Sequence, residues 1–364
     1  MPSLPATDLL DPGDTRPAAR AALGDWLALQ LVLGLKPQLA VDLIRRHRDP
    51  RRALVASSRA LPSFDRCAEI AALARAGAVG MPFVSQAYPA QLAALADPAP
   101  LLLVRGDAGV LSEPAVGIVG ARAATVYGRR VARSLAADLA REGIVIVSGL
   151  ARGIDAEAHL GALESGGRTV AVQACGIDRV YPPEHRTLAD RIAENGAVMT
   201  ELPLRTRPRP AFFPLRNRLI SGLSAAVVIV EARERSGSLI TATHAANQGR
   251  DVFAVPGPIT APTSRGTNRL LRDGAFVALG PDEILDELGV IRGHRSKQSA
   301  DPSPTGPLRE ILDALADEPA SRDELTRRLG REIAQLSVEL LELELDGRIE
   351  EDRDGRLRVT NPGE

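Results

Sequence analysis

The 364-residue chain carries 45 lysine and arginine residues against 46 aspartate and glutamate residues, so its net charge does not indicate a nucleic-acid partner. Its 45% hydrophobic and 25% charged residues are typical of a soluble globular protein, and the length allows two or three domains. Because we find no secretion signal, no apolar stretch of about 20 residues and no metal or disulfide spacing at Cys67 and Cys175, we expect a cytoplasmic protein without membrane contact.

The N-terminal part of the chain contains two predicted segments. Residues 1–20 are rich in Pro, Asp and Ala, which predicts a poorly ordered tail, and residues 21–80 show the apolar pattern of a small helical module. This module is similar to SAM-like or helix-hairpin-helix-like modules. It holds a basic cluster, for which nucleic-acid contact and a solvated helix end both remain open. The cluster is Arg45, Arg46, His47, Arg48, Arg51 and Arg52, and the predicted helices are Trp26–Leu35, Pro37–His47, Pro50–Arg59 and Phe64–Arg75.

Residues 81–292 are predicted to form a Rossmann-like α/β core. Leu101–Val104 is either an edge strand or the entry to this core, and apolar strands then alternate with helices. This rhythm predicts a doubly wound, mostly parallel sheet whose strand-to-helix turns collect at its carboxyl edge. The predicted strands are Val116–Val119, Ile144–Val147, Thr169–Ala174, Val198–Leu202, Ala225–Glu231, Val252–Val255 and Phe276–Leu279. The predicted helices include Val131–Leu139, Pro183–Asn195, Arg216–Leu223, Ser238–Gln248 and Asn268–Arg272.

The C-terminal part reads as a linker, residues 293–307, followed by a winged helix, residues 308–364. Ser321 and Glu324 have the spacing of a capping box. The third helix carries Glu332, Glu339, Glu342 and Glu344, which would be repelled by phosphates, so we expect a protein-contact or accessory role. The predicted elements are helices Leu308–Leu315, Ser321–Leu329 and Ile333–Leu345, and a hairpin over Ile349–Val359 that turns at Asp354-Gly355.

Two neighbouring strands of the core end in glycine-containing turns, which predicts a doubled anion site. Backbone N–H groups at such turns can hold anions, and glycine allows a phosphate to come close. Neither turn is a dinucleotide fingerprint or a Walker A loop, and the only lysines are Lys36 and Lys297, so we expect no nucleotide cofactor. The alternative that the glycines only turn the chain tightly stays open. The site residues are Gly120 and Arg122 in the first turn and Ser148, Gly149, Leu150, Ala151, Arg152 and Gly153 in the second.

Further candidate residues follow later strands of the predicted sheet. An aromatic ring beside arginines can stack on exposed bases and neutralise phosphates, which is typical of single-strand binding. The alternatives are that Arg216 and Arg218 pair with Glu201 or Glu231, and that Ser238 is only a helix N-cap. The candidates are Arg186 after the Tyr181-Pro182 turn, then Phe213, Arg216, Asn217 and Arg218, and finally Ser236, Gly237 and Ser238.

Taken together, these motifs resemble the DprA/Smf family of DNA-processing proteins. The resemblance is strong over residues 86–285 and weak in the flanking modules. It rests on Val116–Arg122, Ser148–Asp155 with Ala158-His159, Phe213–Ser224, Val230–Ala232, Ser236–Thr241 and Gln248–Gly257.

This resemblance implies a core that binds single-stranded DNA and helps load a RecA-type recombinase onto it in natural transformation and homologous recombination, usually as a homodimer. Arg122 matches the family's DNA-binding arginine and Gly149–Gly153 its phosphate-holding turn. The basic residue that the family often has after Tyr-Pro is Pro183 here, with Arg186 as a substitute. The dimer and recombinase surfaces are implied near Leu271–Ala275 and Ser238–Gln248.

Such a function needs no catalytic group, and we identify none and no metal cluster. Asp155 and His159, at i and i+4, are interpreted as a helix-end acid and a packing residue. One rival is a nucleoside-monophosphate phosphoribohydrolase, since the Ser236–Thr241 turn is loosely similar to that of such enzymes, although Ala242–Ala246 lacks their glutamate. A second rival is a duplex-DNA regulator acting through the winged helix.

Overall fold

A computed structural model of the chain describes residues 9–289, 307–317, 319–331, 333–345, 348–352 and 356–359. The chain divides into two compact units, Met1–Val290 and Ile291–Glu364. Residues 1–8 of the predicted tail and residues 293–306 of the predicted linker lie outside the described residues.

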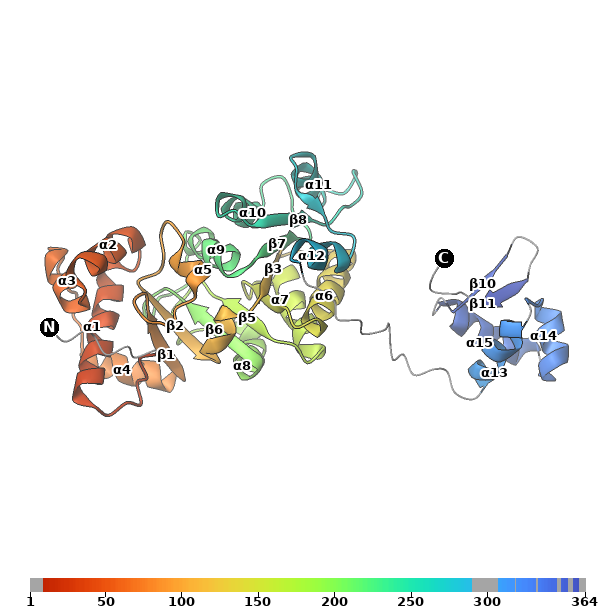
Figure 1. The fold of residues 1–364 in the computed structure, drawn as a ribbon, viewed down its shortest axis with the longest axis horizontal. Helices are drawn as coiled ribbons and strands as arrows, with labels where there is room; N and C mark the ends of the chain where they lie inside the picture. Colours follow the sequence, from red (N-terminus) through yellow and green to blue (C-terminus); the bar gives the residue numbers. More distant parts are fainter. Residues whose placement is uncertain are drawn as a thin grey trace. The chain divides into compact units, whose positions relative to one another are not determined.

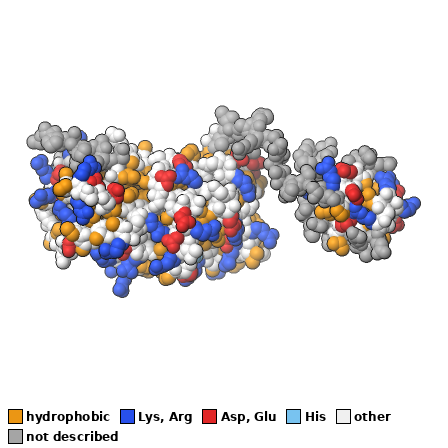
Figure 2. Space-filling model, turned by 90° about the horizontal axis from the view of Figure 1, so that it is seen from below, with side chains coloured by type: hydrophobic (Ala, Val, Ile, Leu, Met, Phe, Trp, Pro, Cys, Tyr) orange, Lys and Arg blue, Asp and Glu red, His pale blue; other side chains and the backbone are white. Residues whose placement is uncertain are grey.

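The N-terminal module contains four helices, as predicted, but order begins earlier than expected (Figure 1). The first helix starts at Pro17, inside the predicted tail, because proline favours the first helical position and the helix buries Leu23 and Trp26. Leu10 is also buried and pairs with Gly80. Lysine and arginine side chains gather over this module at the left of Figure 2. The helices are α1 (Pro17–Leu33), α2 (Pro37–His47), α3 (Pro50–Ala56) and α4 (Arg66–Arg75).

The helical module shares a hydrophobic core with the sheet. Trp26 and Leu29 belong to the same buried cluster as Leu101 and Leu103 of strand β2. Gln30 of α1 is buried there and donates hydrogen bonds from Nε2 to the carbonyl oxygens of Leu101 (3.3 Å) and Glu201 (2.9 Å). The module is therefore fastened to the core rather than packed by itself.

Among the described residues, nine strands form one sheet in the order β1-β2-β6-β5-β4-β3-β7-β8-β9. Strand β2 pairs antiparallel with β1 and β6, and the other pairs are parallel, so the prediction of a doubly wound, mostly parallel sheet is confirmed. Leu101–Val104, for which an edge strand and the entry to the core were both open, forms β2 inside the sheet, so the edge-strand alternative is wrong and β1 takes the edge. The strands are β1 (Ala78–Pro82), β2 (Leu101–Gly106), β3 (Ala115–Val119), β4 (Val145–Ser148), β5 (Thr169–Val172), β6 (Gly196–Thr200), β7 (Ala226–Ile229), β8 (Asp251–Ala254) and β9 (Phe276–Val277).

Successive side chains of the central strands point to opposite faces of the sheet, and those on both faces are buried. Helices therefore cover both faces. Val116 and Ile118 of β3 face the core under α6 and α7, whereas Val119 faces the core under α9 and α10. The helices of this unit are α5 (Ala90–Ala93), α6 (Val126–Arg141), α7 (Ile154–Glu164), α8 (Arg186–Asn195), α9 (Phe212–Leu223), α10 (Gly237–Asn247), α11 (Arg265–Arg272) and α12 (Asp282–Glu287), with short 3-10 turns η1 (Ala108–Ser112) and η2 (Pro183–His185).

The chain reverses its direction across the sheet at β3. From β3 it proceeds through β4 and β5 to β6, and it then returns to the other side of β3 to form β7. The turns after β3 and β7 consequently leave in opposite directions and open a crevice at the carboxyl edge. Ligands of doubly wound sheets bind at this kind of position.

The second unit has the predicted helix–helix–helix–hairpin order. Its capping box is confirmed, since the Glu324 N–H donates to Ser321 Oγ (3.3 Å) and the Ser321 N–H to Glu324 Oε2 (2.9 Å). Glu339 of the third helix pairs with Arg331 at 2.7 Å. Glu332, the hairpin turn at 354–355 and the side chains of residues 342 and 344 lie outside the described residues. The elements are α13 (Pro307–Asp317), α14 (Arg322–Leu329), α15 (Ile333–Leu345), β10 (Ile349–Glu351) and β11 (Leu357–Val359).

None of the helices in the described part of the chain is both long and apolar enough to cross a bilayer.

Candidate nucleic-acid interface

A cleft of about 600 Å³ opens at the crevice between the turns after β3 and β7. The start of α9 and the proline-rich loop before it form its third wall. Its lining includes Gly120, Ala121 and Arg122 after β3, Ala151, Tyr181, residues 208–210, Phe213, Arg216 and Asn217, and Arg233, Arg235, Ser236, Gly237 and Ser238 after β7. The structure thus brings together much of the predicted carboxyl-edge set.

An exposed cation and an aromatic ring form one wall of this cleft. The guanidinium carbon of Arg122 lies 4.6 Å from the centre of the Phe213 ring, within the range of a cation–π contact. Phe213 is half-buried, and the ring of Tyr181, which is 37% exposed, lies 5.8 Å from it between centroids. Arg122, Tyr181 and Phe213 therefore present charge and flat apolar surface side by side.

The electrostatics of the cleft are strongly one-sided. Among the described residues that line it, five are arginines and one, Asp155, is acidic. Asp155 is buried beneath the second turn, where its carboxylate accepts N–H bonds from Gly149 (3.2 Å) and Ala151 (3.4 Å). Burial raises the pKa of Asp155 against the opposing effect of the Arg216 guanidinium. The open part of the cleft is therefore cationic and suited to an anionic ligand. The arginines are Arg122, Arg209, Arg216, Arg233 and Arg235.

Three of these arginines, Arg209, Arg233 and Arg235, were missed from the sequence. Arg209 lies in the loop before α9, where arginine recurs at every second position, Arg205, Arg207 and Arg209, and alternates with proline from residue 207 to residue 210. That alternation was a usable signal, because prolines hold a loop extended and place its cations along one edge. Arg233 follows β7 at the same carboxyl edge and could have been found from the strand boundary.

The second glycine turn serves the protein's own packing. Ser148 is buried and donates from Oγ to the carbonyl oxygen of Ile118 (2.6 Å). A Cβ at Gly149 would lie 2.5 Å from the Arg216 guanidinium, so this glycine makes room for an internal side chain. Leu150 is fully buried, and Arg152 is exposed and pairs with Glu184. Of the six predicted residues, only Ala151 lines the cleft. The tight-turn alternative thus accounts for most of this segment.

Gly153, which ends that turn, joins it to the first one. Its φ is +78°, and a Cβ there would lie 2.3 Å from the carbonyl oxygen of Ala121. The Ile154 N–H donates to the same oxygen at 3.2 Å. The two turns are therefore packed against each other, and this contact fixes the position of Arg122.

Arg216 braces the second turn from below. It is buried and donates to the carbonyl oxygens of Gly149 (2.7 Å) and Val172. Burial lowers its pKa to about 10, so it remains charged at neutral pH. Arg216 lies at the floor of the cleft with its Nη1 donating to the backbone, and its contact with DNA stays a prediction.

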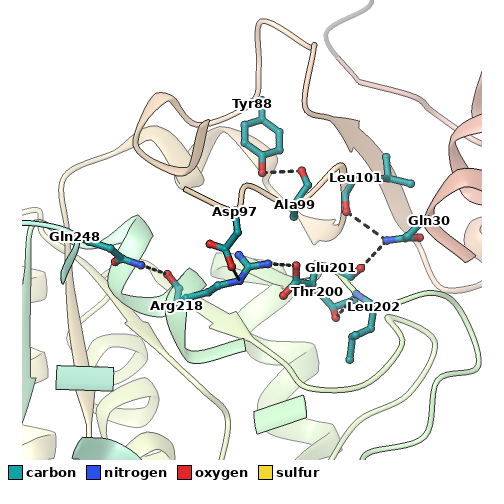
Figure 3. A network of polar contacts seen from close by, with 10 residues as sticks. All are labelled: Gln30, Tyr88, Asp97, Ala99, Leu101, Thr200, Glu201, Leu202, Arg218 and Gln248. Carbon is teal, nitrogen blue, oxygen red and sulfur yellow. Dashed lines mark hydrogen bonds and ion pairs between the residues drawn. The ribbon is translucent and has the colours of Figure 1, made fainter. Parts of the chain in front are cut away.

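Arg218 does not line the cleft, and it belongs to an internal charge network that Figure 3 shows. Its Nε lies 3.0 Å from Asp97 and its Nη2 contacts Glu201, with only 5% of the side chain exposed. The alternative that Arg218 pairs with Glu201 is therefore correct, and the predicted phosphate contact does not fit its position. Asn217, beside it, donates from Nδ2 to the Gly237 carbonyl oxygen at 3.2 Å.

The turn after β7 is confirmed as a strand-to-helix turn, with one correction. Ser236, not Ser238, is the N-cap of α10, and its Oγ accepts the Ser238 N–H at 3.4 Å. Ser236, Gly237 and Ser238 all line the cleft. Arg186 is exposed at the start of α8 and does not line the cleft, so its predicted role as a substitute has no support in this arrangement.

The family follows from comparisons with known proteins. Residues 81–289 match the profile of the family described as DNA recombination-mediator protein A, and residues 295–355 match the DprA winged helix domain. The chain belongs to the DNA recombination-mediator protein A family. It is 41% identical to Protein Smf of Escherichia coli over 275 residues, which covers 73% of this chain and 74% of that protein. It is 42% identical to the DNA processing protein DprA of Bacillus subtilis, over 60% of this chain and 74% of that protein.

Two solved structures of family members are similar to this one. The DprA structure from Streptococcus pneumoniae aligns with a TM-score of 0.63 at 30% identity, covering 72% of this chain and 97% of that one. The DprA structure from Helicobacter pylori, whose title describes a unique single-stranded DNA binding mode, aligns with a TM-score of 0.51 at 34% identity over 55% and 92%. The resemblance to the DprA/Smf family and the Rossmann-like fold with a winged helix are thereby confirmed.

The titratable residues near the site of this family member have structural roles. His159 is fully buried, and its Nδ1 lies 2.7 Å from Thr169 Oγ1, as a packing residue would. Burial lowers the pKa of His159 to about 3, so it is neutral. Asp155 is engaged by backbone N–H groups, as described above. In the described ranges, no group of three or more His, Cys, Asp or Glu side chains is placed to hold a metal ion.

Proposed function

We propose that this chain binds single-stranded DNA, without strong sequence preference, in the cleft at the carboxyl edge of its sheet. The observation that carries the proposal is the Arg122–Phe213 contact at 4.6 Å inside a cleft lined by five arginines and one buried acid. The guanidinium groups would neutralise phosphates, and the rings of Phe213 and Tyr181 would stack on bases that are free of a partner strand. A base-paired duplex offers no such free base face.

The relatives support this proposal. The Helicobacter pylori protein is described by its title as binding single-stranded DNA, and it is 34% identical to this chain. The resemblance read from the sequence implies that Arg122 and the glycine turn at residues 148–153 correspond to motifs of the family.

We further propose that the bound strand is passed to a RecA-type recombinase during homologous recombination and natural transformation. The family description, a recombination mediator, supports a role between the strand and the recombinase. A cytoplasmic location remains our prediction. This function is one of binding and transfer, and it asks for no catalytic group and no cofactor.

The edge strand β9 supports a homodimer. Strand β9 pairs with β8 on one side, and its other side is the edge of the sheet. Phe276 and Val277 of β9 are 44% and 42% exposed, and Leu279, two residues further on, is 72% exposed. An exposed edge strand with apolar side chains is a surface that proteins normally cover. We propose that a second copy of the chain covers it, close to the predicted region Leu271–Ala275.

Strand preference tests the binding proposal. Fluorescence anisotropy with an oligo-dT strand and with its duplex, across a salt series, should show single-strand preference and an affinity that falls with salt. Arg122→Ala should weaken binding markedly, while Arg191→Ala, at an exposed arginine of α8 outside the cleft, should not. Equal, weak binding to both DNAs with no effect of Arg122→Ala would contradict the proposal.

Sedimentation velocity tests the dimer. Leu279→Arg should shift the wild-type dimer to monomer, whereas Val55→Arg, at a side chain of α3 that is 76% exposed in the N-terminal helical module, should leave it a dimer. A wild-type monomer at all concentrations would contradict this part of the proposal without affecting the cleft.

The phosphoribohydrolase alternative is not favoured by the site. Residues 242–246 contain no glutamate, and the nearby Glu231 is buried and accepts hydrogen bonds from the Thr125 N–H (2.9 Å) and hydroxyl. Its carboxylate therefore holds Thr125, the N-cap residue of α6. Hydrolysis of AMP by the purified chain would revive this alternative. Sequence-specific binding of a duplex that requires the winged helix would favour the second rival.

A further inference from the structure

A dense group of arginines surrounds the turn between α2 and α3. Between residues 45 and 52 the sequence is Arg-Arg-His-Arg-Asp-Pro-Arg-Arg, with Asp49 as its single acid. Only Arg48 and Asp49 separate the two helices, so the last turn of one lies beside the first turn of the other. We call Arg45, Arg46, Arg48, Arg51 and Arg52 the α2–α3 patch, and all five are exposed.

The charges of this patch are not balanced within the protein. Among the ion pairs of the described residues, none includes a patch arginine, although arginines elsewhere, such as Arg133 and Arg168, are paired twice. Asp49 is committed to the cap of α3, where its side chain accepts the Arg52 N–H at 2.7 Å. Asp25 of the neighbouring α1 lies close enough to interact with the charge of Arg51, but its ion pair is with Arg66.

The position of two patch arginines opposes local helix stability. Arg51 and Arg52 lie in the first turn of α3, which contains no acidic residue. The backbone dipole of a helix disfavours cations at that end. Arg51 and Arg52 are therefore unfavourable for the helix and form no ion pair among the described residues. Such residues are expected where a ligand outside the fold compensates for them. The ligand that compensates five exposed guanidinium groups is polyanionic.

The composition of the patch distinguishes it from the cleft. Its module presents no exposed aromatic ring among the described residues: Trp26 is buried, Phe64 is half-buried, and Phe83 lies under Arg45, 5.3 Å from its guanidinium carbon. Single-strand sites add stacking platforms to their cations, whereas contact with a duplex backbone needs the cations alone. Guanidinium groups also suit the bidentate recognition of phosphates.

We propose that the α2–α3 patch binds the phosphate backbone of duplex DNA, as a second DNA contact separate from the single-strand cleft. The proposal rests on the patch itself and does not require that the cleft binds a strand. Such a contact is independent of sequence and strongly dependent on salt.

The test measures binding of the full chain to a blunt duplex, to oligo-dT and to anionic phospholipid vesicles across a salt series. The variant is Arg51→Glu/Arg52→Glu, and the matched control is Arg75→Glu/Arg191→Glu, two exposed arginines on α4 and α8. The patch variant should lose about tenfold or more in duplex affinity, with a salt slope smaller by about 2, since each released phosphate contact contributes about 0.9. Its oligo-dT affinity and the control's duplex affinity should stay close to wild type.

Thermal unfolding checks that the patch variant is folded, so that a loss of duplex binding is not caused by unfolding. Because glutamates at the start of α3 agree with the helix dipole, the patch variant should melt at or above the wild-type temperature. If it melts lower, the neutral variant Arg51→Gln/Arg52→Gln replaces it, and the same loss of duplex binding is expected. Duplex affinity and salt slope equal to those of the control would overturn the proposal. Loss of vesicle binding without loss of duplex binding would assign the patch to a membrane surface instead.

Discussion

The guanidinium group of Arg122 lies over the ring of Phe213, with 4.6 Å between its carbon and the ring centre. One residue comes from the turn after β3 and the other from the start of α9, nearly a hundred positions later in the chain. The pair combines a cation for a phosphate with a flat surface for a base. A second ring, Tyr181, extends this surface at 5.8 Å from Phe213.

Replacing Arg122 and replacing Phe213 should affect DNA binding and its salt dependence differently. Arg122→Ala should lower the affinity for oligo-dT and reduce the slope of log affinity against log salt by about 0.7, because one phosphate contact is lost. Phe213→Ala should lower the affinity by about 1–3 kcal/mol with an unchanged slope, because stacking releases no counterions. Tyr127→Ala, at a tyrosine that is 52% exposed outside the cleft, is the control. Identical salt slopes for all variants would contradict the phosphate role of Arg122.

Arg218 should matter for stability and not for DNA. Arg218→Ala leaves Glu201 and Asp97 without their cation, and breaking a buried pair costs about 3–5 kcal/mol of unfolding free energy. Arg152→Ala removes an exposed pair with Glu184, for which we expect about 0–1 kcal/mol. Urea unfolding measures both. Weakened oligo-dT binding by fully folded Arg218→Ala protein would restore this residue to the DNA site.

Two glycines with positive φ should differ in their response to a side chain, because Gly153 has both a tight contact and, with ψ of −125°, a backbone conformation outside the left-handed helical region. Gly153 and Gly166 have similar φ values of +78° and +75°, but a Cβ lies 2.3 Å from the Ala121 oxygen at Gly153 and meets nothing within 4 Å at Gly166. Gly166→Ala should cost about 1–2 kcal/mol from the left-handed conformation alone. Gly153→Ala should cost clearly more and should also weaken oligo-dT binding, since it displaces the turn that carries Arg122. Equal costs for the two variants would show that the contact between the turns is not tight.

His159 should make the protein sensitive to acid. Burial lowers its pKa to about 3, so the folded state binds fewer protons than the unfolded state between that value and the ordinary 6.5. Its contribution to stability is therefore complete above pH 6.5 and is lost toward pH 3, by about 1.4 kcal/mol per pH unit. Urea unfolding of wild type and His159→Gln from pH 7 to pH 4 should show stability curves that converge on acidification.

Glu201 has the opposite effect on the pH dependence of stability. The effect of His159 must therefore be taken from the difference between wild type and His159→Gln. Burial raises its pKa to about 7, so its contribution is present below its ordinary value of 4.5 and is lost as the pH rises toward 7. Both proteins share this effect, and it cancels in their difference. Parallel curves for wild type and His159→Gln would mean that His159 does not titrate as a buried group.

Patterns along the chain were enough for much of the fold. Alternating apolar strands and helices predicted the doubly wound sheet, and the spacing of Ser321 and Glu324 predicted a capping box that is present. These features depend on period and on neighbours a few residues apart. The edge strand β1 escaped prediction because its five residues, Ala78–Pro82, show no alternation that separates them from a helix end.

The sequence by itself determined the class of fold, the family and the position of the turns that form the site. Only the tertiary structure decided which side chains of those turns are free. Arg122, Arg216 and Arg218 look alike as residues, yet one is exposed beside Phe213, one braces a turn and one is held by Asp97 and Glu201. The physical reason is that burial and pairing arise from contacts between segments far apart in the chain, and residue type carries no information about such contacts.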